Sequence, residues 1–288
     1  MSYHNMLMVK PGSKIKLKEI APDYTGKHEN HESAMHELEK STDKLRKLQH
    51  LLYAEDKRSI LICLQGLDAS GKDGTINHVL GSMNPQGTRV CGFKIPSKEE
   101  AAHDFLWRFH KQTPAKGEVV IFNRSHYEDV LVVRVHNLVQ DDVWSKRFDA
   151  INEFEKNLVN GGARIIKFFL HISPEEQLRR FEQRFEDPTR LWKISMSDYT
   201  EREFWDQYTK AYEDVFSRTS TEYAPWYVIP SNHKWFRNLA VSKIVVKTME
   251  DLNMKYPEPT VDIDVIRSKY HKAYKKEKAG QRKNKRHK

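Results

Sequence analysis

Four short apolar runs divide the chain, and they constrain its fold more than any other feature. They are SILICLQ (59–65), EVVIFN (118–123), ARIIKFFLHI (163–172) and WYVIP (226–230). Runs this short that are apolar at nearly every position are typical of strands buried on both faces of a sheet. Helix-forming stretches lie between and around them, at 31–55, 98–112, 141–160, from 174, at 198–218 and from 234. The alternation predicts an α/β fold, with a central parallel sheet flanked by helices on both faces.

The first apolar run leads directly into GLDASGKDG (66–74). Its glycine and lysine spacing is that of a phosphate-binding P-loop, and a strand before it and a helix after it are the context that the motif requires. The glycines let the backbone curl so that N–H groups face phosphate oxygens, while the helix N-terminus and the lysine add positive charge. The predicted phosphate-binding residues of this loop are Gly66, Ala69, Ser70, Gly71, Lys72, Gly74 and Thr75.

Two carboxylates make this loop unusual. A common P-loop places Ser or Thr after the lysine, where the hydroxyl binds Mg²⁺, but this chain has Asp73, and Asp68 lies just upstream. The pair would weaken the positive potential of the loop unless it holds Mg²⁺, which prefers oxygen ligands. Asp73 alone also fits a carboxylate that stabilises the helix dipole, and Asp68 also fits a group that orients the acceptor. We predict a Mg²⁺ site at Asp68 and Asp73, with Mn²⁺ as a substitute.

Charged residues also follow the second apolar run and lie on the helix before it. Arg124 directly follows EVVIFN, where its planar guanidinium suits phosphate, and Glu128, a turn later, suits the metal or an acceptor group. Both also fit salt bridges at the start of a helix. Arg108, in HDFLWRFH (103–110), stands where nucleoside monophosphate kinases often hold the acceptor phosphate. By that analogy it is a candidate for acceptor binding.

The segment LRRFEQRFEDPTRLWK (178–193) carries basic residues at helical spacing. Arg180 and Arg184 share one helix face, and Arg190 and Lys193 follow Pro188. Phosphoryl transfer spreads negative charge over equatorial oxygens, which movable arginines neutralise when a lid closes. A solvated basic face would produce the same pattern. Beside a P-loop we interpret the segment as a lid over about residues 178–197.

Five stretches together resemble the polyphosphate kinase 2 family. They are GLDASGKDG, HDFLWR, FNRSHYEDVLVVRVH, EDPTRLWKIS and TSTEYAPWYVIPSNHKW, and the match extends from about residue 10 to about residue 255. The last three resemble the class III branch, which acts on both nucleoside mono- and diphosphates. In the family an Asp follows the P-loop lysine, so Asp73 matches. Asn123 stands where general P-loop enzymes have Asp, and the family accepts both.

The resemblance implies a P-loop kinase-like three-layer sandwich with a helical lid. It implies Mg²⁺ dependence and reversible phosphoryl transfer between inorganic polyphosphate and purine nucleotides, AMP to ADP and ADP to ATP, by a homo-oligomer (dimer or tetramer). The expected catalytic residues are Asp68, Lys72, Asp73, Arg124 and Arg184. The expected phosphate- or nucleotide-binding residues outside the loop are Arg108, Glu128, Arg180 and Lys193.

The net charge of +9 is concentrated at the C-terminal end. Residues 267–288 carry 11 Lys and Arg against one acid, so the rest of the chain has a net charge of −1. We predict an extended N-terminal arm (1–30), a catalytic domain (31–258) and a basic C-terminal helix and tail (259–288). No run approaches the roughly 18 apolar residues of a membrane span. Without a signal-peptide pattern, and with two isolated cysteines, we expect a cytoplasmic protein.

Two rival functions share parts of this pattern. An ATP-dependent nucleotide kinase would have the same loop and lid, but it would favour Ser or Thr where Asp73 stands and would ignore polyphosphate. A nucleic-acid-binding protein would work through the tail KKEKAGQRKNKRHK (275–288) with strong salt dependence. The near-neutral body argues against nucleic acid as a partner.

Overall fold

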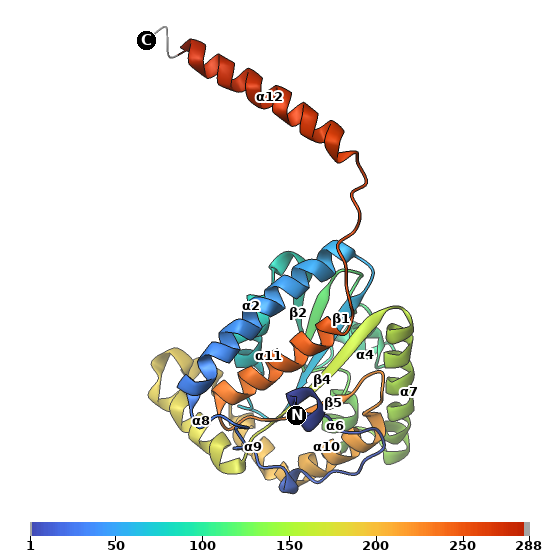
Figure 1. Cartoon of the computed structure of the whole chain (residues 1–288). Coiled ribbons are helices and arrows are strands. Elements are labelled where there is room, and N and C mark those ends of the chain that lie inside the picture. The colour runs from blue at the N-terminus through green and yellow to red at the C-terminus, as the bar shows by residue number, and fades with distance from the viewer. Residues whose placement is uncertain (1, 285–288) are drawn as a thin grey trace. The chain divides into compact units, whose positions relative to one another are not determined.

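Five parallel strands form one sheet in the order β2-β3-β1-β4-β5 (Figure 1). The computed structural model describes residues 2–284 of the chain. The strands are β1 (Ser59–Gln65), β2 (Thr88–Gly92), β3 (Val119–Asn123), β4 (Ala163–His171) and β5 (Trp226–Pro230). The predicted strands and their parallel pairing are confirmed. The central strand β1 ends at the P-loop, with β3 and β4 on either side, so residues after all three strands meet at one edge.

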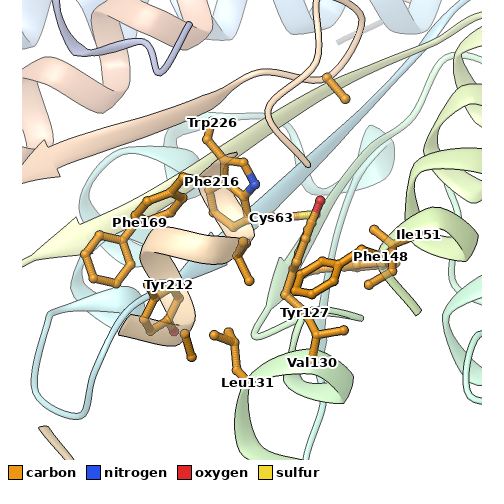
Figure 2. Packing of buried hydrophobic residues seen from close by; sticks show 14 of the residues in the cluster. Cys63, Tyr127, Val130, Leu131, Phe148, Ile151, Phe169, Tyr212, Phe216 and Trp226 are labelled. Atoms are coloured by element: carbon orange, nitrogen blue, oxygen red, sulfur yellow. The ribbon is translucent and has the colours of Figure 1, made fainter. Parts of the chain in front are cut away.

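Helices cover both faces of the sheet. One face packs against α2 (His31–Glu55) and α11 (Lys234–Glu250), which lie side by side, and the other against α6 (Glu128–Val135), α7 (Asp141–Asn160) and α10 (Trp205–Thr219) (Figure 1). The side chains of β1 alternate between the two cores: Ile62 joins the first, and Cys63 joins the second. Figure 2 shows Cys63 in the second core among aromatic rings that include Tyr127 and Trp226. The three-layer sandwich is confirmed.

Shorter elements connect these layers. The α-helices are α1 (Tyr3–Leu7), α3 (Lys72–His78), α4 (Lys98–Ala101), α5 (Trp107–His110), α8 (Pro174–Glu186) and α9 (Met196–Glu203). The 3-10 segments are η1 (Leu17–Glu19), η2 (Leu80–Ser82), η3 (Pro85–Gly87) and η4 (Pro188–Lys193). The single helix predicted over 98–112 is wrong. It breaks into α4 and α5, because the Asp104 carboxylate accepts the Leu106 N–H at 2.9 Å and replaces a helical bond.

The N-terminal arm differs from the extended segment that the sequence predicted. It contains α1 and η1, and it packs along β5, where Val9 N–H donates to Trp226 O at 2.8 Å. Val9 and Leu17 are both buried. The arm therefore belongs to the compact unit Met1–Met254 rather than standing apart from it.

Residues Lys255–Lys288 form a second unit, so the boundary lies slightly before the predicted one at 258/259. This unit contains the predicted basic helix, α12 (Ile263–Asn284). The end of the predicted tail, at 285–288, lies outside the described residues. Within residues 2–284 no helix is long and apolar enough to cross a bilayer.

Candidate active site

The P-loop follows β1 in a tightly curled conformation. Gly66, Ala69 and Gly71 have positive φ angles of 148°, 59° and 105°. A Cβ on Gly66 would lie 2.7 Å from Ser70 Oγ and 2.9 Å from Leu170 O, so the loop has no room for a larger residue at this position. Helix α3 begins at the lysine of the motif, which is the geometry that turns backbone N–H groups toward an anion.

Lys72 is buried and folds back over the loop. Its ammonium donates to Gly66 O at 2.7 Å and to Leu67 O at 3.3 Å. Burial and then the neighbouring Arg124 lower the pKa of Lys72 to about 8. A phosphate bound at the loop would supply the negative charge that this buried ammonium lacks.

The two loop carboxylates are each held by a residue at the end of β3. Asp68 Oδ1 accepts from Arg124 Nη2 at 2.9 Å, and Asp73 Oδ1 accepts from Asn123 Nδ2 at 3.0 Å. Asp73 keeps its second oxygen open, with Lys193 Nζ at 3.7 Å and 64% of the side chain exposed. Asn123, which the sequence did not single out as a ligand, thus orients a predicted one.

The donor set fits Mg²⁺ shared with phosphate. Among the described residues no group of three His, Cys, Asp or Glu is arranged to hold a metal. Mg²⁺ commonly takes one or two protein carboxylates and completes its shell with substrate phosphates and water. Asp68 and Asp73 line the same cavity and offer that number of carboxylates.

That cavity measures about 920 Å³ and is strongly cationic. Among the described residues that line it, Asp68 and Asp73 are the only acids. The nine lining cations are Lys72, Lys94, Arg124, Arg180, Arg184, Arg190, Lys193, Lys234 and Arg237. Such a surplus inside a low-dielectric cleft favours a ligand that carries several negative charges.

Arg124 is held in a left-handed conformation, with φ 63°. Its backbone N–H donates to Leu64 O at 3.1 Å, and its guanidinium contacts Asp68 and lies 3.7 Å from Glu128. Glu128 itself is not among the cavity-lining residues and begins α6. Both predictions for Arg124 are therefore present. It forms salt bridges at the start of a helix, and it also lies beside the phosphate loop.

The lid corresponds to α8, η4 and α9. Arg184 lines the cavity, donates to Asp198 Oδ2 at 3.1 Å and packs on the Phe181 ring. Arg190 and Lys193 extend from η4 into the same cavity. The structure thus brings three of the four basic lid residues to the cavity, where Arg184 and Arg190 also pair with Asp198 and Asp187.

Arg180, the fourth, has a different environment from the one predicted. It is buried, and its five N–H donors are used by Glu176 and by backbone carbonyls. The carbonyls are Ala69 O (2.8 Å), Ser70 O (2.9 Å), Ser231 O and Asn232 O (3.2 Å). Arg180 therefore holds the backbone of the P-loop, and although it lines the cavity it has no donor left for phosphate.

Other predicted ligands also lie behind the loop surface. Thr75 is buried and donates to Gly71 O at 3.1 Å, while the buried Ser70 Oγ has no hydrogen-bond partner among the described residues. Arg108 is not brought to the cavity: it is buried, donates to Lys94 O at 2.8 Å and lies 4.7 Å from the Phe109 ring centre. The analogy that made Arg108 an acceptor ligand fails because its side chain points into the core beside β2, where it fixes the backbone of a residue that does line the cavity.

Arg237 is the site residue that the sequence analysis missed. It lies on α11, is only 2% exposed, and donates to Asn238 Oδ1 at 2.8 Å. No carboxylate of the described residues pairs with it, and burial and then Arg180 lower the pKa of Arg237 to about 9. The available signal was its place in PSNHKWFR (230–237), about two turns past the end of a buried strand at the ligand edge of the sheet.

A buried polar cluster supports the turn that carries Arg124. Lys167, in the middle of β4, donates to Glu155 Oε2 (2.6 Å), Tyr127 Oη (2.9 Å) and Thr219 O (2.7 Å). Tyr127 Oη in turn donates to Glu155 Oε1 at 2.8 Å, and His126 Nε2 lies 3.1 Å from the same oxygen. All hydrogen-bond donors of the buried ammonium are satisfied, so the cluster fixes residues that directly follow Arg124.

Known proteins with similar sequences point to one family. The family model described as polyphosphate kinase 2 matches residues 28–257. A Meiothermus ruber protein named AMP/ADP-polyphosphate phosphotransferase is 52% identical over 87% of this chain and 94% of its own. A Rhodopseudomonas palustris protein named ADP-polyphosphate phosphotransferase is 43% identical over 86% of this chain and 90% of its own.

A solved structure agrees with these sequence matches. Polyphosphate kinase 2 from Arthrobacter aurescens TC1 superposes with a TM-score of 0.91 at 39% identity, covering 94% of this chain and 97% of that one. The P-loop, the lid and the cationic cavity all lie within the residues that the family model matches. The chain is therefore a kinase that belongs to the polyphosphate kinase 2 family.

Proposed function

We propose that this enzyme transfers the terminal phosphoryl group of inorganic polyphosphate to AMP and to ADP, and that it also runs both reactions in reverse. The observation that carries the proposal is the cavity with nine cations and two carboxylates beside a P-loop. The names of the Meiothermus ruber and Rhodopseudomonas palustris relatives support the same reaction class. Their difference concerns AMP, which the first name includes and the second does not.

The donor end would lie on the P-loop. Backbone N–H groups at the start of α3, together with Lys72 and Arg237, surround this position with positive charge. A phosphoryl group in transit carries its charge on three equatorial oxygens, and fixed cations stabilise that charge without reorganising. Arg184 and Lys193 would add to it from the lid once the donor is bound.

The acceptor needs little activation. Phosphate oxygens of AMP and ADP are already anionic at neutral pH, so in-line attack on the donor requires positioning rather than a strong base. Arg124 would orient the acceptor phosphate, because it lines the cavity and pairs with Asp68. Asp68 and Asp73 would hold Mg²⁺, with Mn²⁺ as a substitute, and the ion would supply positive charge that stabilises the phosphate oxygens.

The cellular location and the oligomeric state are also part of the proposal. We expect the enzyme to act in the cytoplasm, where its nucleotide substrates are, and to form a homo-oligomer, either a dimer or a tetramer. Analytical ultracentrifugation of the full chain would test the oligomeric state. A sedimentation coefficient that matches a 34.0 kDa monomer at assay concentrations would contradict that part of the proposal.

The deciding experiment is product analysis with purified protein, Mg²⁺ and long-chain polyphosphate, offered AMP and ADP in separate reactions. The proposal expects ADP from AMP and ATP from ADP, with the Lys72→Ala variant as the inactive control. ATP from ADP alone would restrict the acceptor to diphosphates. No product from polyphosphate, together with transfer from ATP to AMP, would replace the proposal with an ATP-dependent nucleotide kinase.

A further inference from the structure

Helix α12 places three of its lysines opposite its two tyrosines, while a fourth, Lys278, packs over the Tyr274 ring at 5.0 Å. At about 3.6 residues per turn, Lys269, Lys272 and Lys276 share one face, and Tyr270 and Tyr274 lie on the other. The two tyrosine rings stack with centroids 6.0 Å apart, as expected for neighbours one turn apart. The helix therefore has a face that is basic and free of aromatic groups.

The charge of this face is not neutralised within the helix. Residues 263–284 carry eight Lys and Arg against two acids. Among the side chains of α12 that the structure describes, the one ion pair joins Arg267 and Asp264 at 2.9 Å. The three lysines of the basic face are exposed. A persistent row of unpaired cations is a binding surface for a polyanion.

The catalytic body lacks such a surface charge. Outside residues 267–288 the chain has a net charge of −1, so its cationic cavity is set in a nearly neutral molecule. The cavity is about 920 Å³, the size of a small-ligand site, and accommodates only a short part of a long polymer. Helix α12 lies outside residues 28–257, which the family model matches.

We propose that the basic face of α12 binds the part of a long polyphosphate chain that remains outside the active site. This inference rests on the proposed function, since it takes the same polymer as its ligand. Binding at a tethered second site raises the effective concentration of chain ends at the cavity without any new catalytic contact. The gain applies only to chains long enough to occupy both sites.

The arrangement of side chains favours polyphosphate over single-stranded nucleic acid. Proteins that bind single strands interleave basic residues with aromatic rings on which the bases stack. In α12 the tyrosines lie away from Lys269, Lys272 and Lys276, and the Tyr274 ring is covered by Lys278 rather than open to a base. Lysine is a point charge without a planar stacking surface. The basic face thus offers charge alone, which suits a polymer that consists of phosphate.

The test compares the wild-type full chain with the Lys269→Gln, Lys272→Gln, Lys276→Gln triple variant. A matched control carries the same charge change on the body, at the exposed Lys146, Lys156 and Lys210. Steady-state kinetics with ADP are measured for long-chain polyphosphate and for tripolyphosphate at several salt concentrations. All six positions are exposed, so the substitutions leave the fold intact.

The α12 variant is expected to raise KM for long-chain polyphosphate about tenfold at low salt, with kcat and all tripolyphosphate parameters unchanged. The slope of log KM against log salt should fall by about 2, because three counterion-releasing contacts are lost. Equal KM values in wild type and variant would overturn the inference. So would an equal shift in the body control, or tighter lysine-dependent binding of single-stranded RNA or of anionic lipid vesicles. No turnover of polyphosphate by the wild type would instead refute the proposed function.

Discussion

The guanidinium of Arg237 packs against the α-carbon of Gly71, so that a Cβ on this glycine would overlap Nη1. A Cβ added at Gly74, three residues later, would lie 3.0 Å from Nη2 of the same arginine. Two of the glycines of the P-loop thus make room for an arginine as well as for a phosphate. Burial and Arg180 lower the pKa of Arg237 to about 9, and an anion bound beside it would stabilise its charged form.

Replacing Arg237 should therefore separate stability from activity. We expect Arg237→Met to raise the free energy of unfolding by about 1–2 kcal/mol. The substitution removes a buried charge that has no carboxylate partner within residues 2–284. The same variant should lose about 100-fold in kcat/KM for polyphosphate, since one fixed cation at the donor site is gone. Urea unfolding and initial-rate kinetics measure the two effects.

Arg108→Met is the matched control for this prediction. Arg108 is also buried, but Glu100 and Asp129 each lie 3.8 Å from its guanidinium and Lys94 O accepts from it. Its removal leaves a buried carboxylate less well paired, so the control should be destabilised rather than stabilised. Stabilisation by both substitutions, or by neither, would contradict the distinction between an unpaired and a paired buried arginine.

The fold was predictable because its signals are local. Apolar runs, helix periodicity and the P-loop spacing each depend on neighbours in the sequence, and the apolar runs located β1, β3, β4 and β5. The break between α4 and α5 was missed because it depends on whether the Asp104 side chain bonds to solvent or to the backbone. The packing of Val9 against β5 was missed because the arm has few hydrophobic residues. Their spacing shows no period that would indicate which element the arm packs against.

The site was predictable where residues immediately follow a strand and, in the lid, for three of the four basic residues. Lys72, Asp73 and Arg124 stand within the first turns after β1 and β3, where the sheet dictates their direction. Arg108 and Arg180 lie on helices, and whether such a side chain faces the cavity or the backbone behind it depends on the rotation of the helix. Arg237 was overlooked for the same reason, since nothing in a single sequence shows that α11 turns it toward the loop.

Activity should decline as the pH rises through about 8. The pKa of Lys72 is lowered to about 8 by burial and Arg124, so the free enzyme loses this ammonium in that range and binds the anionic donor less well. We expect kcat/KM for polyphosphate to fall above pH 8. The corresponding decline in kcat should lie at higher pH, because bound phosphate raises the pKa of the lysine. A kcat/KM that stays constant to pH 9 would contradict the assignment.

Removal of metal should abolish turnover, and Asp73 should set how much Mg²⁺ is needed. With the acceptor and donor saturating, Asp73→Asn is expected to raise the half-saturating Mg²⁺ concentration about 10- to 100-fold. Asn123→Ala should raise it less, because the amide only orients the carboxylate. Isothermal titration of Mg²⁺ into enzyme with bound polyphosphate and no acceptor gives the same ranking without turnover. Unchanged Mg²⁺ dependence in both variants would remove Asp73 from the metal site.

Glu155 and Lys167 should behave as one unit. Burial alone would raise the pKa of Glu155, but Lys167 and His126 hold it below the ordinary value. Burial lowers the pKa of Lys167 and Glu155 opposes this, so each group favours the charged form of the other. Glu155→Leu and Lys167→Met are each expected to lower the free energy of unfolding by about 3–5 kcal/mol, because each leaves a buried charge unpaired. The double variant Glu155→Leu, Lys167→Met should recover most of this loss.

The two single variants and the double variant also test whether the buried cluster positions the active site. Tyr127 bonds to both charged groups and lies three residues after Arg124, so the stable double variant should still lower kcat while KM for polyphosphate changes little. A purely structural cluster would give wild-type kcat once stability is restored. Denaturant unfolding supplies the coupling energy, and steady-state kinetics of the double variant separates the two roles. Additive losses of stability would show that Glu155 and Lys167 are not coupled. They would then give no support to the inference that the buried cluster positions Arg124.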